Sequence, residues 1–172
     1  MKNLIIKNGL IATAILMGIN LLSLVIYGTD AEYFDIGEVI GYSSIVLCLL
    51  FVFMGIRESE MLHGNSSFIK RLSVGSAIAF FPSLAFGIYN VIYVTIIDPQ
   101  FMEKYNTYML DKLKEGHTPE EFEAIKTQYL ADAAMWDSLL IQFFVMFLTV
   151  FVIGLIIALL SSMYFQLKPA RS

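Results

Sequence analysis

Between Leu72 and Ile97 the chain carries no Asp, Glu, Lys or Arg, and this stretch constrains the fold more than any other feature. As a helix rising about 1.5 Å per residue, it is long enough to cross a hydrocarbon core of about 30 Å. Small residues recur at every fourth position in it, which places them in one row: Gly75, Ala79, Ser83 and Gly87. Such a row lets another helix approach closely in lipid, where apolar surface alone does not drive helices together. The stretch therefore predicts a membrane-spanning helix with a tightly packed face.

Three further apolar runs, at residues 9–27, 39–56 and 139–165, accompany this stretch. The chain is 58% hydrophobic and 15% charged, whereas soluble domains are about a quarter charged. We therefore expect an all-α integral membrane protein, with residues 1–172 forming a single domain of four transmembrane helices. The first run follows Lys2 and Lys7 as a secretory signal would, but its length favours an uncleaved signal anchor over a cleaved signal.

Residues 98–137 form the one sizeable polar segment and predict a helical hairpin inserted between the third and fourth spans. Asp98 followed by Pro99 predicts a helix start, with the carboxylate as cap. After Gly116, the spacing of Thr118 and Glu121 predicts a second helix that starts with a capping box. Both helices carry an apolar stripe, and we expect the stripes to pack on each other rather than to form a groove for a partner.

The distribution of Lys and Arg predicts the orientation in the membrane. Arg57, Lys70 and Arg71 lie at the link between the second and third runs, and Lys168 and Arg171 lie in the C-terminal tail. The short link between the first two runs has no Lys or Arg. Because basic links stay on the cytoplasmic side, we expect both termini inside and the hairpin extracytoplasmic. Aromatic rings then fall near the outer interface at Tyr27, Tyr42, Tyr93 and Trp136, and near the inner one at Tyr164.

Short motifs in order along the chain carry a resemblance to a known family. They are Phe53-Met54-Gly55-Ile56-Arg57, Ser67-Phe68, Val74-Gly75, the segment Asp98 to Tyr105 and the segment Gly154 to Leu159. With them the chain resembles the uncharacterised membrane-protein family filed as domain of unknown function 4199, which is found widely in Bacteroidota. The resemblance implies a four-span protein, and we expect it in the cytoplasmic (inner) membrane of a bacterium. It implies no activity.

No catalytic, cofactor-binding or metal-binding motif is evident in the sequence. In this topology His63 and His117 lie on opposite sides of the membrane, whereas a zinc site needs three or four ligands together. There is no glycine-rich phosphate loop, nucleophile elbow or CxxC pair, and the single cysteine, Cys48, lies inside an apolar run. We therefore do not expect an enzyme or a cofactor. The net charge of −4 argues against a nucleic-acid partner.

Neutral polar residues inside the apolar runs leave two interpretations open. Asn20, Asn90 and Gln142 are expected within the membrane, and no ionisable residue accompanies them at the centres of the runs. They either form hydrogen bonds between helices or line a neutral polar path for a lipid or solute. A proton-coupled pump is disfavoured, because pumps use ionisable residues.

The fourth run repeats the row of small residues with Gly154, Ala158 and Ser162. The two rows are expected to face each other within one chain, and the rival arrangement is a dimer in which one row faces a second copy. The sequence thus favours a structural or accessory envelope component, with the bilayer and a second copy or an envelope protein as partners. The alternative is a component of a transport, channel or lipid-handling system, and an enzyme at the outer interface has the least support.

Overall fold

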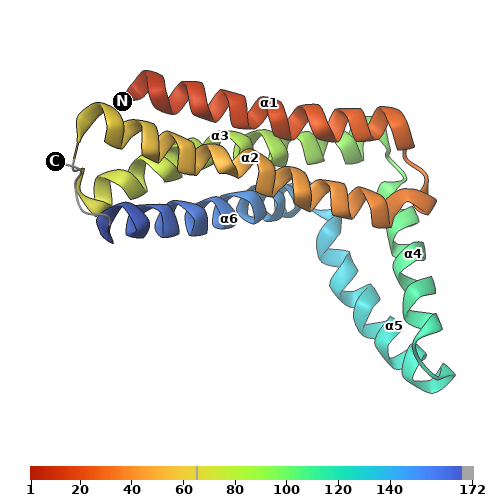
Figure 1. The fold of residues 1–172 in the computed structure, drawn as a ribbon. Helices are drawn as coiled ribbons and strands as arrows, with labels where there is room; N and C mark the ends of the chain where they lie inside the picture. Colours follow the sequence, from red (N-terminus) through yellow and green to blue (C-terminus); the bar gives the residue numbers. More distant parts are fainter. Residues whose placement is uncertain (65, 168–172) are drawn as a thin grey trace.

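The computed structural model describes residues 1–64 and 66–167, and this part of the chain is all-helical (Figure 1). Four long helices form a bundle: α1 (Lys2–Tyr27), α2 (Phe34–His63), α3 (Phe68–Ile92) and α6 (Leu139–Leu167). Two shorter helices, α4 (Phe101–Glu115) and α5 (Pro119–Ala133), form a pair that projects from one end of the bundle. Short turns join them: η1 (Ala31–Tyr33), the π-helical η2 (Tyr93–Ile97) and η3 (Ala134–Asp137). Asn65, Lys168 and Arg171 lie outside the described residues.

The prediction of four membrane-length helices is confirmed. Each of the four bundle helices has the length and the apolar composition to cross a membrane, and α6 has the highest mean hydropathy, 3.1. α2 extends beyond its apolar run at both ends, and α3 begins before its run. In the extension at the C-terminal end of α2, the Glu58 carboxylate binds both Lys7 and Asn8 of α1.

Small residues bring α3 and α6 into close contact at the centre of the bundle. A Cβ atom built on Gly154 would lie only 2.5 Å from the Cβ of Ala79, and one on Gly75 would lie 2.6 Å from the Cβ of Ala158. The structure thus places the two rows of small residues against each other within one chain. The row on α3 ends differently, because Gly87 lies against the Phe143 ring rather than a small residue.

The two serines of these rows are buried without bridging the helices. The hydroxyls of Ser83 and Ser162 donate to carbonyls of their own helices, each at 2.7 Å. Around them the core is formed by large apolar side chains that have no exposed surface: Leu16, Leu49, Val52, Ile56, Ile78 and Val150. Cys48 belongs to the same core, and its thiol donates to the carbonyl of Ile45.

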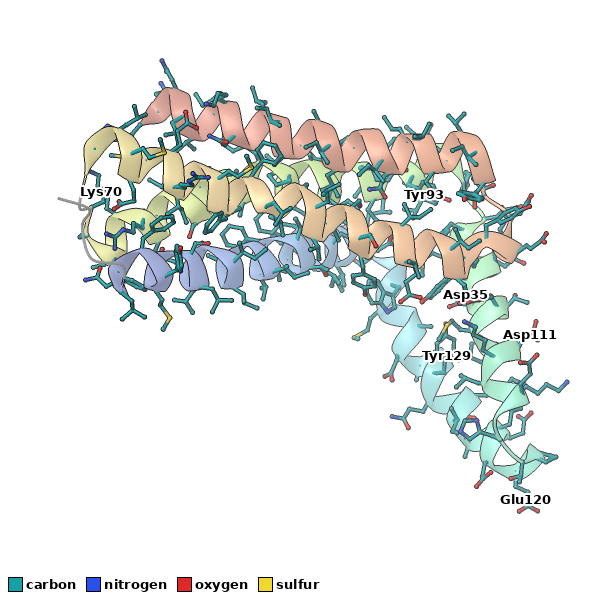
Figure 2. The ribbon with its side chains drawn as sticks, in the orientation of Figure 1. Asp35, Lys70, Tyr93, Asp111, Glu120 and Tyr129 are labelled. Carbon is teal, nitrogen blue, oxygen red and sulfur yellow. The ribbon has the colours of Figure 1, made fainter. Side chains whose placement is uncertain are left out.

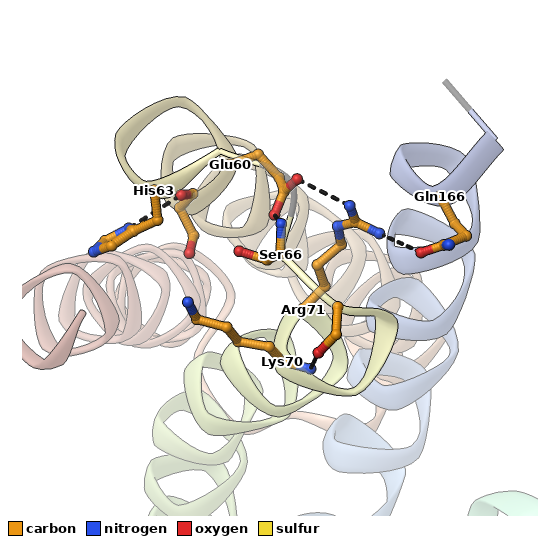
Figure 3. Close-up of polar contacts among 8 residues, drawn as sticks. Glu60, His63, Ser66, Lys70, Arg71 and Gln166 are labelled. Atoms are coloured by element: carbon orange, nitrogen blue, oxygen red, sulfur yellow. Dashed lines mark hydrogen bonds and ion pairs between the residues drawn. The ribbon is translucent and has the colours of Figure 1, made fainter. Parts of the chain in front are cut away.

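A buried arginine ties three helices together at the end of the bundle opposite the α4–α5 pair (Figure 3). Arg71, in the first turn of α3, donates to a Glu60 carboxylate oxygen of α2 at 3.0 Å and to the Gln166 amide oxygen of α6 at 2.8 Å. Glu60 also accepts from the backbone N–H of Ser66, and the Ser67 hydroxyl caps α3. Only 5% of the Arg71 surface is exposed, so this contact is part of the packed structure.

The α4–α5 pair confirms one predicted helix cap and contradicts the other. Thr118 and Glu121 form the predicted capping box: the Thr118 N–H donates to Glu121, and the Glu121 N–H donates to the Thr118 hydroxyl. Asp98 does not cap α4, which begins only at Phe101. Its carboxylate binds the Lys104 ammonium at 3.0 Å instead, because a buried carboxylate is better stabilised by an ion pair than by one N–H. α5 does not run straight into α6, since η3 and an extended Ser138 intervene.

Candidate functional site

A half-enclosed cavity of about 650 Å³ lies where the α4–α5 pair meets the bundle. Its walls come from the ends of α1 and α3, the beginnings of α2 and α6, and the parts of α4 and α5 next to the bundle. The side chains of Tyr93 and Tyr129 lie toward this junction in Figure 2. Volumes of this size are typical of sites that bind small molecules.

Aromatic side chains dominate the lining of the cavity. Eight of the nine tyrosines of the chain line it, together with its one tryptophan, Trp136: Tyr27, Tyr33, Tyr42, Tyr89, Tyr93, Tyr105, Tyr108 and Tyr129. Four of these tyrosines form a continuous series of ring contacts with Phe101: Tyr89, Tyr93, Tyr105 and Tyr108. In this series Tyr93 meets Phe101 at 5.3 Å between centroids, and Phe101 stacks on Tyr105 at 5.7 Å. The aromatic residues expected at the outer interface thus turn toward a shared space.

Most of the tyrosine hydroxyls lack a protein partner. Tyr108 donates to Asp35 at 2.7 Å, and Tyr129 donates to Asn106 at 2.9 Å. Within the described part of the chain, the other cavity tyrosines form no hydrogen bond through their hydroxyls: Tyr27, Tyr33, Tyr42, Tyr89, Tyr93 and Tyr105. Burial raises the pKa of the Tyr105 hydroxyl. The six hydroxyls without a protein partner are able to form hydrogen bonds with water or a ligand.

The three neutral polar residues singled out in the apolar runs all line this one cavity. Asn20 donates to the Ser44 hydroxyl at 3.1 Å and to a carbonyl of its own helix. Asn90 donates to the Gln142 amide oxygen at 3.2 Å, and the Gln142 amide donates to the Trp136 carbonyl. The interhelical hydrogen bonds of the first interpretation are therefore present, and the same three residues line the cavity.

Two glycines of α2 leave room for the cavity. Gly37 and Gly41, one helical turn apart, both line it, and a Cβ atom built on either would meet no other atom within 4 Å. Neither has a positive φ, so a side chain at these positions would fill the cavity without straining the backbone. This pair is the signal by which the sequence could have pointed to a cavity, because residues four apart share one face of a helix.

The charged side chains that line the cavity are carboxylates. Asp30, Glu38 and Asp132 belong to the lining, which contains no Lys or Arg. The nearby lysines are bound elsewhere: Lys104 to Asp98, and Lys112 to Asp35 at the start of α2. The hydrogen bond from Lys112 to Asp35 raises the pKa of the Lys112 ammonium. Both contacts also attach α4 to the rest of the molecule, since Lys104 reaches the Thr29 carbonyl at 3.3 Å.

The cavity brings together polar groups of several kinds. Its polar groups are amides, phenols and exposed carboxylates, and no nucleophile–base pair is formed among the described residues that line it. In the same part of the chain no three His, Cys, Asp or Glu side chains gather as a metal site would require. The two sets of residues singled out in the sequence lie in different parts of the molecule. The small-residue rows lie along the α3–α6 contact, whereas the neutral polar residues lie at the cavity.

The four apolar helices indicate a multi-pass membrane protein of all-helical fold. A family model described as "Protein of unknown function (DUF4199)" matches residues 7–166, so the chain belongs to that family. The match extends from the first turns of α1 to the end of α6 and includes the α4–α5 pair. A comparison with curated proteins finds no match, and a comparison with solved structures finds none either.

Proposed function

We propose that this protein binds an amphipathic molecule in the cavity between the bundle and the α4–α5 pair, as a component of a lipid-handling or transport system. The proposal rests on the composition of the lining. Most of the lining is aromatic or apolar, and a few amides and tyrosine hydroxyls supply polar groups. This composition suits a ligand with an apolar chain and a small polar head, because ligand sites are mostly apolar with a few orienting polar groups. The geometry therefore favours the function that the sequence ranked second.

Trp136 allows a direct test, since it is the only tryptophan and it lines the cavity. In dodecyl maltoside micelles, 8-bromo-1-octanol should quench Trp136 fluorescence saturably, and unbrominated 1-octanol should relieve the quenching. Gly41→Leu, which fills the cavity, should weaken the saturable quenching about tenfold or more, given that a buried Leu removes space for several methylenes.

Gly18→Leu is the matched control. Gly18 lies on α1 outside the lining, and a side chain there would also meet nothing within 4 Å. This variant should bind as the natural chain does. Quenching that rises linearly without saturation, to the same extent in all three proteins, would show only partitioning into the micelle and would overturn the proposal.

A structural or accessory envelope role, the function expected first from the sequence, is the second candidate. It is supported by two exposed apolar side chains, Leu130 of α5 (45%) and Met135 of η3 (60%). Such apolar side chains suit contact with a second copy or an envelope protein. A photo-crosslinking residue in place of Leu130 should then form one discrete adduct in intact cells, and a smear of weak products would contradict this role.

We further propose that residues 1–172 form one membrane domain, with residues 98–137 inserted on the extracytoplasmic side and both termini in the cytoplasm of a bacterium. Arg57, Lys70 and Arg71 support this orientation, because basic residues favour the cytoplasmic side. In Figure 1 the start of α1 and the end of α6 lie at one end of the bundle, and the α4–α5 pair lies at the other. The inner membrane is the bilayer that fits this assignment.

A further inference from the structure

We propose that the cavity selects an amphipathic organic cation, a molecule with an ammonium head and an apolar tail. This inference rests on the proposed function and adds the charge of the ligand. It rests on where the charged side chains lie. Three carboxylates belong to the lining, whereas the nearby lysines lie outside it and are bound to other carboxylates.

The three carboxylates of the lining come from three separate parts of the chain. Asp30 precedes η1, Glu38 is in the second turn of α2, and Asp132 is near the end of α5. Within the described residues none of these carboxylates forms an ion pair or a hydrogen bond. Three unpaired carboxylates around one space create a negative potential there, and a cleft with low-dielectric walls focuses it.

The lysines that could neutralise this potential are held outside the lining. Lys104 is bound by both oxygens of Asp98 at 3.0 Å, and Asp98 is 5% exposed. Lys112 is bound by Asp35 and lies over the Tyr108 ring. Neither the two lysines nor their two carboxylate partners belong to the lining. These two lysines are therefore paired with Asp98 and Asp35, whereas the three carboxylates of the lining are unpaired within the described residues.

The aromatic rings favour the same kind of ligand. A cation over the face of a Tyr or Trp ring is attracted by the ring quadrupole, and this attraction grows when water is excluded. Tyr105 and Trp136 are two of the aromatic residues of the lining, while Phe86, Val145 and Met146 supply apolar surface for a tail. An anionic head at the same place would meet three unpaired carboxylates, whereas the nearest lysines, Lys104 and Lys112, are already bound to Asp98 and Asp35. The ammonium head and the apolar tail are thus both accommodated.

The test compares three competitors with the same eight-carbon chain: octyltrimethylammonium, 1-octanol and octyl sulfate. Each is titrated against the Trp136 quenching by 8-bromo-1-octanol in dodecyl maltoside micelles, whose head groups carry no charge. Octyltrimethylammonium should displace the probe at about tenfold lower concentration than 1-octanol, and octyl sulfate should be the weakest.

Neutral isosteres identify the groups responsible. Glu38→Gln with Asp132→Asn should remove most of the advantage of octyltrimethylammonium and leave 1-octanol unchanged. The matched control is Glu103→Gln with Asp111→Asn, which neutralises two exposed carboxylates of α4 outside the lining and should keep the advantage.

The outcomes separate this inference from the proposed function. If all three competitors displace the probe equally, or if octyl sulfate is the strongest, the cavity binds amphiphiles without selecting cations, and only this inference is wrong. The same conclusion follows if the control pair of substitutions acts like the cavity pair. If the probe itself shows no saturable quenching, the proposed function fails and this inference fails with it.

Discussion

Charged residues at the two ends of the bundle differ in burial and in pairing. At one end Arg71 is buried and satisfied by Glu60 and Gln166, although its Nε–H has no partner among the described residues. At the other end Glu38 and Asp132 are exposed and unpaired. A buried ion pair is costly to break, because the remaining partner keeps its desolvation penalty. Breaking the first group should therefore cost stability, whereas neutralising the second should not.

Arg71→Met should strongly destabilise the protein, by about 3–5 kcal/mol, because it leaves the Glu60 carboxylate without its cation. Thermal unfolding in detergent measures this change. Lys126→Met is the control, since Lys126 and Glu123 form an exposed pair at 3.5 Å that is worth at most about 1 kcal/mol. Equal losses in the two variants would contradict the structural role of Arg71.

Pairs of elements show why the bundle is tight in one place and open in another. The α3–α6 contact is close because small residues oppose each other, whereas Gly37 and Gly41 of α2 have no opposing residue and leave space. The same residue type therefore has opposite consequences in the two places. A glycine gives close packing where another helix faces it and leaves open space where none does.

Gly75→Ala should destabilise the protein by about 1–3 kcal/mol, since the new methyl would lie 2.6 Å from the Cβ of Ala158 and 2.8 Å from a methyl of Ile56. Gly18→Ala introduces the same methyl into open space, so it should be neutral or stabilising by up to about 1 kcal/mol. Unfolding of both variants in the same detergent makes the comparison. A harmless Gly75→Ala would mean that α3 and α6 are farther apart than described.

The capping box of α5 should be pH-dependent. Hydrogen bonds from Thr118 to the Glu121 carboxylate lower the pKa of Glu121. Its stabilising contribution is therefore complete above the unfolded pKa, about 4.3, and is lost as the pH falls through the lower folded value. NMR titration of the Glu121 side chain should give a pKa below about 4.3, and Thr118→Ala, which removes the hydroxyl but keeps the backbone N–H, should raise the pKa part of the way back. Unchanged titration in Thr118→Ala would show that the cap does not hold the carboxylate.

Sequence patterns predicted what depends on neighbours along the chain and missed what depends on distant contacts. The four spans follow from apolar runs, and the α5 cap follows from the spacing of Thr118 and Glu121. The prediction of an Asp98 cap was wrong because no local pattern singles out Lys104 as the partner of this carboxylate. The cavity was missed for the same reason, since six helices contribute to it and no single segment carries its pattern.

At the scale of the whole molecule, orientation is the property on which the proposed roles depend. A reporter that is active only in the cytoplasm should give signal when fused after Ser172 and none when inserted at Gly116, because the basic residues lie at the ends assigned to the inside. A periplasm-active reporter at the same two sites should give the reverse result. Cytoplasmic signal at Gly116 would place the cavity at the inner face and contradict the four-span topology.

The burial of Cys48 has a practical consequence for thiol chemistry. Its side chain has no exposed surface, and it is the only cysteine of the chain. A maleimide added to the folded protein should therefore react only when α2 separates from its neighbours, so the labelling rate reports the frequency of that opening. Ligands that fill the cavity should slow the labelling, since binding to the folded state lowers the population of the open one. Fast labelling at a rate independent of denaturant would show that the thiol is already accessible. The native chain thus contains its own reporter of unfolding within a bilayer, with no substitution required.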